Sequence, residues 1–299
     1  NKGAAYNKAK EYDKAIESLE MAILKMPNHG GAYTNLGNVY NKLHDYEKAS
    51  KLHEKSIELE PNGSNAYSNL GTSYKYLGLS NKAISSYKKA IELDPNFVNA
   101  HFDLATMYLA MEDFENGWKE YEWRFKKEEM IPHIIRHKDI FSKPLFTGAE
   151  DIKGKILLLH SEQGYGDSIQ FIRFLPQIKE KFGCKIAVKC REGLKELFQT
   201  MSEIDVIADR NEATPQFDYQ LSIMSMPFVL GMKSINDLPK RIPYLKSTPY
   251  KELEIKKEKG KINIGICWSA SVTGESYEGK VFDLKFFEPL MNNPKINLY

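Results

Sequence analysis

The stretch Tyr33-Thr-Asn-Leu-Gly-Asn-Val-Tyr40 returns 34 residues later as Tyr67-Ser-Asn-Leu-Gly-Thr-Ser-Tyr74, and again as His101-Phe-Asp-Leu-Ala-Thr-Met-Tyr108. Three prolines keep the same step of 34 residues, at Pro27, Pro61 and Pro95. A fixed period of this length is typical of solenoids, in which each unit buries its apolar face against the next. The period therefore predicts stacked helix pairs over residues 1–129, about four repeats with the first incomplete.

The recurring columns indicate how one unit packs. Gly37 and Gly71 are expected to face Ala49 and Ala83 of the second helix, where larger side chains would push the axes beyond the usual ~8–10 Å. The tyrosine and leucine columns fill the space around these small residues. A proline closes each unit because it lacks an N–H and clashes with the preceding turn. Each unit is therefore a helix, a turn, a second helix and a stop.

This pattern resembles the tetratricopeptide repeat (TPR) family over residues 1–129. The resemblance implies an α-solenoid whose surface binds a peptide or another protein. The fourth unit departs from the pattern at Arg124 and Glu129. We therefore expect the fourth unit to cap the stack.

One polar column runs along the first helices of the repeats. Asn35, Asn69 and Asp103 occur at the 34-residue step, each just before the leucine column. The row resembles the asparagine ladder of the protein O-GlcNAc transferases, in which amides that donate and accept hydrogen bonds grip a peptide backbone. Ordinary polar residues on a helix surface are the alternative explanation, and an ionised Asp103 cannot donate.

Composition excludes several classes of partner. The 299 residues carry 42 Lys and Arg against 40 Asp and Glu, which gives no basis for nucleic-acid binding. No stretch reaches the ~18 apolar residues of a membrane span. The three cysteines stand in no metal-ligand spacing, so we expect reduced thiols, no metal and a cytoplasmic protein. Because Asn1 lies within a repeat and Tyr299 lies early in a predicted domain, we expect truncation at both ends, so the sequence cannot exclude a signal peptide.

The pattern changes after the repeats. From Gly154 onward, short apolar runs such as Lys155–His160 and Lys185–Lys189 alternate with helical segments, which predicts a parallel sheet. The run Ile156-Leu-Leu-Leu159 is apolar on both faces, as in a buried parallel strand. The expected order is residues 1–129 as repeats, 130–150 as a packed junction, 151–258 as a Rossmann-like domain and 259–299 as the start of a second.

The segment His160-Ser-Glu-Gln-Gly-Tyr-Gly-Asp-Ser-Ile-Gln170 directly follows the first predicted strand. Parallel sheets bind ligands beyond the carboxyl ends of their strands. Gly164 and Gly166 leave room for a ligand near the backbone, although neither the dinucleotide nor the P-loop fingerprint is present. Asp167 is either an N-cap of a helix that starts near Ser168 or a catalytic carboxylate.

Residues 154–176, from Gly-Lys-Ile-Leu-Leu-Leu-His to Phe-Leu-Pro, resemble the opening of bacterial TPR-linked glycosyltransferases related to the heptosyltransferase-like family. Further segments agree in order: Tyr121-Glu-Trp-Arg124, Phe217-Asp-Tyr-Gln-Leu-Ser-Ile-Met-Ser-Met-Pro227 and Ile264-Gly-Ile-Cys-Trp-Ser269. The resemblance covers about residues 118–299. It implies a GT-B fold of two Rossmann domains and sugar transfer from a nucleotide-linked donor without a metal or other cofactor.

The resemblance also implies roles for single residues. Asp167 matches the proposed general base of these relatives, so that transfer would invert the anomeric carbon. The loop around it would hold the acceptor or a phosphate, through Gln163, Gly164, Gly166 and Ser168. The donor side would be lined by Trp268, Ser269, Ser271, Thr273 and Lys280. Ser271 and Thr273 fit a simple polar loop as well, and Lys280, where the family has Arg, fits a surface charge.

Two hypotheses from different classes follow. The first is an inverting glycosyltransferase that acts on a protein or peptide held by the repeats and uses a nucleotide sugar. The second is a TPR interaction scaffold with a non-catalytic α/β region. Since Tyr299 falls about one strand and one helix into the second predicted domain, we expect residues 1–299 alone to be inactive.

Overall fold

The computed structural model describes residues 2–128, 138–162, 164–246, 258, 260–264 and 284–298. Contacts divide the chain into two compact units, residues 1–246 and residues 247–299. The first unit contains the repeats and a parallel sheet, and the second contains two short strands. No helix among these described residues is long and apolar enough to span a membrane.

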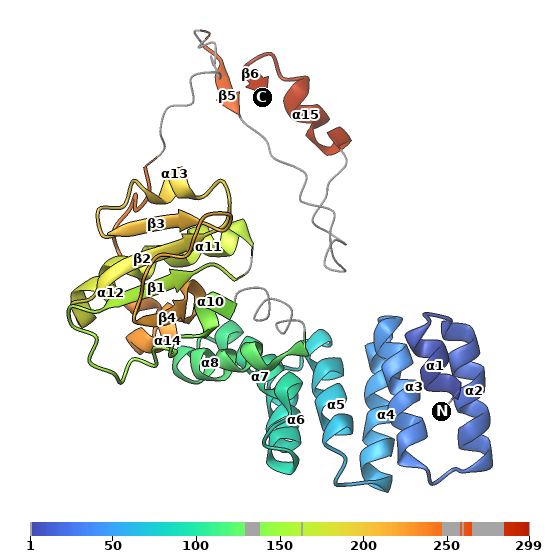
Figure 1. The fold of residues 1–299 in the computed structure, drawn as a ribbon. Helices are drawn as coiled ribbons and strands as arrows, with labels where there is room; N and C mark the ends of the chain where they lie inside the picture. Colours follow the sequence, from blue (N-terminus) through green and yellow to red (C-terminus); the bar gives the residue numbers. More distant parts are fainter. Residues whose placement is uncertain are drawn as a thin grey trace. The chain divides into compact units, whose positions relative to one another are not determined.

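Four helix pairs follow one another along residues 2–128 (Figure 1). They are α1 (Lys2–Lys8) with α2 (Tyr12–Lys25), α3 (Gly30–Lys42) with α4 (Tyr46–Leu59), α5 (Ser64–Tyr76) with α6 (Ser80–Leu93), and α7 (Val98–Ala110) with α8 (Phe114–Tyr121). The helices α2, α4 and α6 each end two residues before a proline, which confirms the predicted stop. A 3-10 segment, η1 (Glu122–Lys126), follows α8 directly.

The glycine column packs differently from the prediction. A side chain at Gly37 would meet the ring of His53 at 2.5 Å, and one at Gly71 would meet the ring of Tyr87 at 2.7 Å. The atoms nearest to the two glycines belong to His53 and Tyr87 and not to Ala49 and Ala83, which were the expected neighbours. The space left by each glycine is filled by an aromatic ring from the second helix of the same repeat. Burial there lowers the pKa of His53 to about 4.

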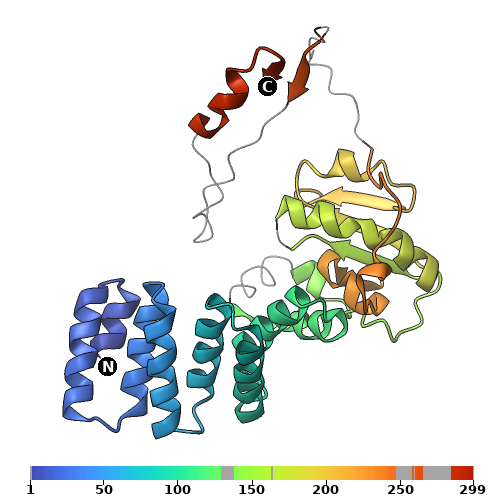
Figure 2. The ribbon, with the colours of Figure 1, turned by 180° about the vertical axis from the view of Figure 1, so that it is seen from behind.

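The α/β region is built on a four-stranded parallel sheet with the order β3-β2-β1-β4. Its strands are β1 (Ile156–His160), β2 (Lys185–Cys190), β3 (Val206–Asp209) and β4 (Tyr219–Ser222). The predicted parallel sheet is confirmed. The strand β4 was not among the strands predicted from the sequence. Between β1 and β2 run α11 (Tyr165–Phe171), η3 (Ile172–Phe174) and α12 (Leu175–Phe182), which cross one face of the sheet (Figure 2). The remaining segments are α10 (Lys138–Phe141), α13 (Lys195–Phe198), η4 (Ile223–Ser225), α14 (Met226–Leu230) and η5 (Ile235–Asp237).

The strand β1 is buried on both faces, as its apolar run predicts. Leu157 and Leu159 join the large core beneath α11 and α12, whereas Leu158 packs with Ile140 of α10 on the other side. A strand buried on both faces is apolar along nearly all of its length. The exception in β1, His160, shares a hydrogen bond with the Gln220 side chain at 2.9 Å. This arrangement places the carboxyl end of β1, and the loop after it, in the middle of the side of the sheet where the four strands end.

The last repeat shares its core with the sheet. Ala105 and Tyr121 belong to the same buried cluster as Leu157. The rings of Trp118 and Phe171 pack edge to face, with their centroids 5.7 Å apart. A cap presents a polar outer face to water. The fourth repeat instead buries its outer side against the α/β region. Its departure from the repeat pattern at Arg124 therefore reflects this contact, and the expectation of a cap was wrong.

In the second unit, β5 (Ile262–Ile264) pairs in parallel with β6 (Ile296–Leu298). Between them lie η7 (Leu284–Phe287) and α15 (Glu288–Met291). The predicted strand at residues 262–266 is thus described for its first three residues. The residues predicted for the donor side lie between β5 and η7, outside the described part of the chain.

Candidate functional sites

The first helices of the repeats form one continuous face. α3 contacts α5, and α5 contacts α7. Asn35, Asn69 and Asp103 occupy equivalent positions on these three helices, and each is half-buried. Among the described residues, none makes a hydrogen bond to the side-chain amide of Asn35 or Asn69. We call this surface the first-helix face.

A second polar column ties the first helices together. The Asn41 side chain on α3 accepts a hydrogen bond from the Ser73 hydroxyl on α5 at 2.9 Å. One repeat further, Lys75 donates to the Thr106 hydroxyl at 3.2 Å and lies 3.6 Å from the Asp103 carboxylate. These hydrogen bonds were not predicted from the sequence, although Asn41 and Lys75 stand at the same 34-residue step.

Asp103 differs from the two asparagines in its surroundings. Burial raises the pKa of its carboxyl, and the charges of Lys75 and Lys127 oppose that effect. The Asp103 side chain is therefore already engaged by a cation, while the amides of Asn35 and Asn69 are not. The third position of the predicted row has a different chemistry from the first two.

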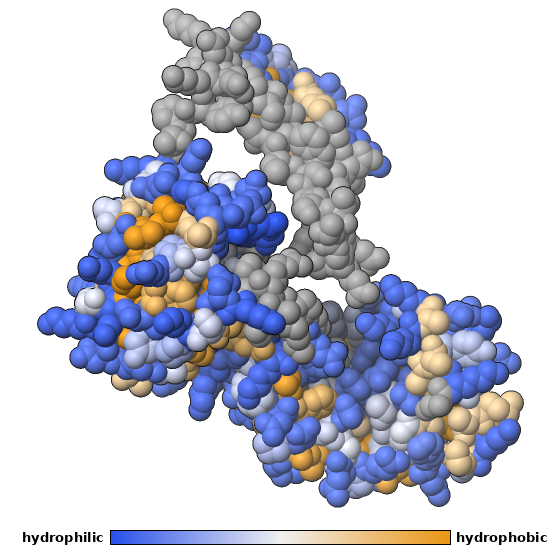
Figure 3. Space-filling model, in the orientation of Figure 1, coloured by the Kyte–Doolittle hydropathy of each residue, from blue (hydrophilic) through white to orange (hydrophobic). Residues whose placement is uncertain are grey.

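In the view of Figure 3 the repeats are mostly hydrophilic, with apolar residues scattered among charged ones. Exposed large apolar side chains in the repeats include Leu24, Tyr76 and Met111. Scattered exposed apolar residues are normal for a protein surface and do not mark an apolar groove.

The loop after β1 leads directly into α11. α11 begins at Tyr165, with Gly164 as its N-cap, so the expected start near Ser168 was wrong. The Asp167 carboxylate, in the first turn, accepts a hydrogen bond from the Gly164 N–H at 2.9 Å. Ser168 is buried, and its hydroxyl donates to the Gly164 carbonyl at 3.1 Å. Asp167 thus stabilises the start of a helix, although not as its N-cap.

The position of this loop follows from the strand order. The chain runs outward from β1 through β2 to β3, and then returns to pair β4 with the other side of β1. In open parallel sheets, ligands bind at such a reversal, beyond the carboxyl ends of the two strands. Gly166 is exposed, with no atom within 4 Å of the place a side chain would take. Gln163, the remaining predicted loop residue, lies outside the described residues.

A buried charge network lies where the chain leaves β1 and β4. Arg124, only 2% exposed, donates from Nε to the Glu162 carboxylate at 2.9 Å and from Nη1 to Glu122 at 2.6 Å. Its Nη2 donates to the Ser225 hydroxyl at 2.7 Å. The Ser222 hydroxyl, at the end of β4, donates to Glu162 at 2.6 Å. We call these five residues the Arg124 network.

The Arg124 network unites three segments that lie far apart in the sequence. Arg124 comes from Tyr121–Arg124, Glu162 from the loop after β1, and Ser222 and Ser225 from residues 217–227. Burial disfavours the charged guanidinium, but the facing carboxylates of Glu162 and Glu122 raise the pKa of Arg124 above its usual range. An available signal was the column Ala22, Ser56, Ala90, in which the fourth member is an arginine.

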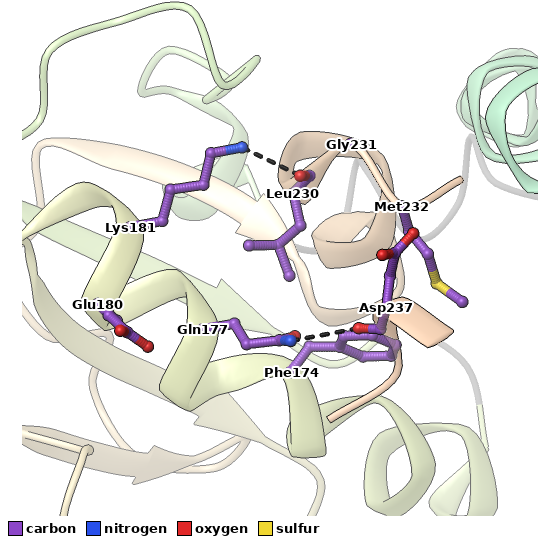
Figure 4. Close-up of a pocket in the computed structure, with 8 residues that line it drawn as sticks. All are labelled: Phe174, Gln177, Glu180, Lys181, Leu230, Gly231, Met232 and Asp237. Carbon is purple, nitrogen blue, oxygen red and sulfur yellow. Dashed lines mark hydrogen bonds between the residues drawn. The ribbon is translucent and has the colours of Figure 1, made fainter. Parts of the chain in front are cut away.

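Two cavities lie elsewhere in the α/β region. One, of about 430 Å³, lies between α12 and the chain after α14, and Figure 4 shows Gln177 donating to the Asp237 carbonyl and Lys181 to the Leu230 carbonyl. Another, of about 400 Å³, lies beyond the ends of β2 and β3 and is lined by Lys189, Arg210 and Thr214 among others. Neither contains a residue predicted from the sequence.

The described residues contain no group of three His, Cys, Asp or Glu side chains that could hold a metal ion. Two of the three cysteines, Cys184 and Cys190, are buried free thiols. Burial raises the pKa of Cys190 to about 11, which keeps it protonated and unreactive near neutral pH.

Models of the tetratricopeptide repeat match residues 28–96 and 86–120. The chain therefore carries tetratricopeptide repeats in this stretch, as the 34-residue period predicts. Among curated proteins, Protein FlbA of Caulobacter vibrioides is 25% identical over 213 residues, or 63% of this chain and 34% of that protein. The chain thus spans about a third of the length of this relative. Because the last repeat helix ends at Tyr121, about 40% of the way along the 299 residues, the match includes part of the chain after the repeats.

Solved structures are similar as well. MamA is 22% identical, with a TM-score of 0.39 and coverage of 46% of this chain and 78% of that one. The first TPR of Spaghetti (RPAP3) bound to HSP90 peptide SRMEEVD is 26% identical, with a TM-score of 0.36 and coverage of 37% and 87%. The Arabidopsis OM64 TPR domain is 23% identical, with a TM-score of 0.35 and coverage of 36% and 88%. TM-scores below 0.5 do not establish a common overall fold.

Proposed function

We propose that the repeats hold an extended segment of another protein on the first-helix face, and that Asn35 and Asn69 contact its backbone. The observation that carries this proposal is the pair of unengaged amides at equivalent positions of adjacent helices. An amide side chain both donates and accepts, so it matches the N–H and C=O groups of a peptide. Recognition of this kind depends little on the peptide's side chains.

The spacing of the two amides suits an extended chain. Neighbouring helices in such a stack lie about 8–10 Å apart. An extended peptide advances by about 3.3 Å per residue. Successive first helices would then meet the peptide backbone about every three residues. Asp103, at the third position, can accept from a peptide N–H but cannot donate while ionised, so the peptide would be gripped differently there.

A test needs a peptide that binds, and a displayed library of random 12-residue peptides selected on the purified chain supplies one. We expect Asn35→Ala and Asn69→Ala each to weaken binding about fivefold to tenfold, the net value of a hydrogen bond or two. The matched control is Asn81→Ala, because Asn81 is exposed on a second helix. Fluorescence anisotropy gives the Kd. Equal losses for Asn81→Ala, or selected peptides that ignore both asparagines, contradict the proposal.

A second candidate function is favoured by the place of the loop after β1. We propose that the α/β region belongs to an inverting, metal-independent glycosyltransferase that uses a nucleotide sugar, with Asp167 as general base. One oxygen of Asp167 accepts from Gly164, and the half-buried carboxylate stands at the reversal of strand order. Gln163, Gly164, Gly166 and Ser168 would hold the acceptor or a phosphate, and residues 268–280 would hold the donor. The scaffold function of the repeats does not depend on this second proposal.

The transferase proposal is tested on the full-length protein with a panel of nucleotide sugars. We expect one donor to be hydrolysed slowly, and Asp167→Asn to lower that rate about 100-fold or more, as for loss of a general base. Asp151→Asn is the control, because Asp151 is an exposed carboxylate before β1. Absence of turnover with every donor contradicts the proposal and leaves the peptide-binding proposal intact.

A further inference from the structure

We infer that Arg124, carried by the last repeat, is a positioning residue for the loop that follows β1. The ligand-facing edge of the sheet is then built jointly by the repeats and the α/β region. The catalytic meaning of this inference rests on the second proposed function. The structural part, that Arg124 sets the loop, stands on the contacts of the Arg124 network alone.

The first step concerns Glu162. Its side chain is fully buried, and one oxygen, Oε1, receives hydrogen bonds from both Arg124 and Ser222. The other oxygen, Oε2, is buried and has no partner among the described residues. The carboxylate is therefore retained through a single oxygen. A buried charge that loses its partner escapes toward water if its backbone can follow.

The second step leads from Glu162 to the loop. Glu162 stands two residues before Gly164, the N-cap of α11, and five before Asp167. The hydroxyl oxygen of Ser161, its neighbour, lies 3.0 Å from that of Ser168 on α11, within hydrogen-bond distance. A displacement of Glu162 would thus move the N-cap and loosen the hydrogen bond between Gly164 and Asp167. Arg124 controls Glu162 from a segment 38 residues earlier in the chain.

A plain adhesive role is the alternative for Arg124. Apolar contacts already join the last repeat to the sheet, through Trp118 on Phe171 and the shared buried cluster. Moreover, the Arg124 network holds one positive charge and two negative ones, Glu162 and Glu122. Buried ion pairs of this kind are weak sources of stability, and a defined geometry is the contribution attested in some systems. The forked guanidinium fixes two carboxylates and a hydroxyl in one arrangement, which a lysine cannot do.

Hydrogen exchange of the whole chain, measured by mass spectrometry, tests the inference without any substrate. In Arg124→Met we expect the exchange of the amides of residues 161–171 to rise about tenfold more than that of the amides of β2, which follows the loss of global stability. Lys233→Met is the control. The Lys233–Glu115 ion pair also bridges the last repeat and the α/β region, but it is exposed. We expect no change at residues 161–171 in that variant.

Arg124→Lys separates geometry from charge and serves if Arg124→Met does not fold. Lysine keeps the positive charge but lacks the fork, so we expect residues 161–171 to exchange faster while the thermal midpoint stays near wild type. Wild-type exchange at residues 161–171 in Arg124→Lys overturns the inference. An equal increase in β2 also overturns it, because the role is then adhesive. Neither result depends on whether the protein transfers sugar, so failure of the second proposed function remains distinguishable.

Discussion

The repeats and the α/β region use polar side chains in opposite ways. In the repeats, ties such as Asn41 to Ser73 are half-buried and link positions about one period apart. Where the last repeat meets the α/β region, Arg124 is buried and joins residues 38 and 101 positions away. The comparison teaches that a substitution on the first-helix face should affect only the hydrogen bonds of the repeat that carries it. The sheet edge depends on a single buried charge.

The largest expected effect breaks the network. Arg124→Met leaves two carboxylates without their cation, and we expect a loss of about 3–5 kcal/mol in the free energy of unfolding. The midpoint of urea unfolding, followed by tryptophan fluorescence, measures it. Asn41→Ala in the repeats should cost about 1 kcal/mol. If the two variants lose the same stability, the contrast between the regions is wrong.

A glycine in each region sharpens the comparison. Gly71→Ala places a methyl group 2.7 Å from the Tyr87 ring, and we expect a loss of about 1–3 kcal/mol from overpacking. Gly166→Ala, in α11, meets no atom within 4 Å, so we expect unchanged or slightly raised stability. Thermal unfolding of both variants checks this pair. A destabilising Gly166→Ala would mean that the loop after β1 is more tightly packed than described.

The repeats also carry a dependence on pH. Burial lowers the pKa of His53 from 6.5 to about 4, so the folded protein binds this proton less readily than the unfolded chain. Stability from the neutral ring is complete above pH 6.5 and is lost as pH falls toward 4. Between pH 8 and pH 5 we expect a loss of about 2 kcal/mol from this residue.

His53→Leu tests that dependence, because repeat one already has Leu19 in the same column. The variant should be about 2 kcal/mol less sensitive to the change from pH 8 to pH 5 than the wild type. Urea unfolding at the two pH values gives the difference. An unchanged pH dependence in His53→Leu would show that other groups control acid stability.

The smallest expected effect concerns the tie between the second and third repeats. Ser73→Ala removes the hydroxyl that donates a hydrogen bond to Asn41. The free energy of unfolding should fall by about 1 kcal/mol or less. We expect the exchange of amides in α3 and α5 to rise while those of β1 stay unchanged. An increase in β1 as large as that in α3 and α5 would contradict a local role for this hydrogen bond.

The sequence predicted the repeats well because their contacts recur at one spacing. The period located the helix ends before Pro27, Pro61 and Pro95, but it could not tell which column faces which across a helix pair. Gly37 was therefore matched with Ala49 when its neighbour is His53. A repeat period shows which residues occupy equivalent positions in different repeats. It does not show which residues touch within one repeat.

The α/β site was predictable only in part. The apolar run at β1 and the two glycines located the loop correctly at a strand end. The start of α11 was misplaced because a glycine N-cap carries no side-chain signal, and Asp167 could serve either as an N-cap or as a first-turn acceptor. The Arg124 network escaped detection because the three segments that it joins are 38 to 103 residues apart with no repeating pattern.

The most direct test of the account is the affinity of a selected peptide for Asn35→Ala/Asn69→Ala. Because the two amides lie on separate helices, their losses should add to about 25-fold to 100-fold in Kd. Asn81→Ala should bind like the wild type. A double variant that binds the peptide with wild-type affinity would contradict the claim that the first-helix face holds an extended chain by its backbone.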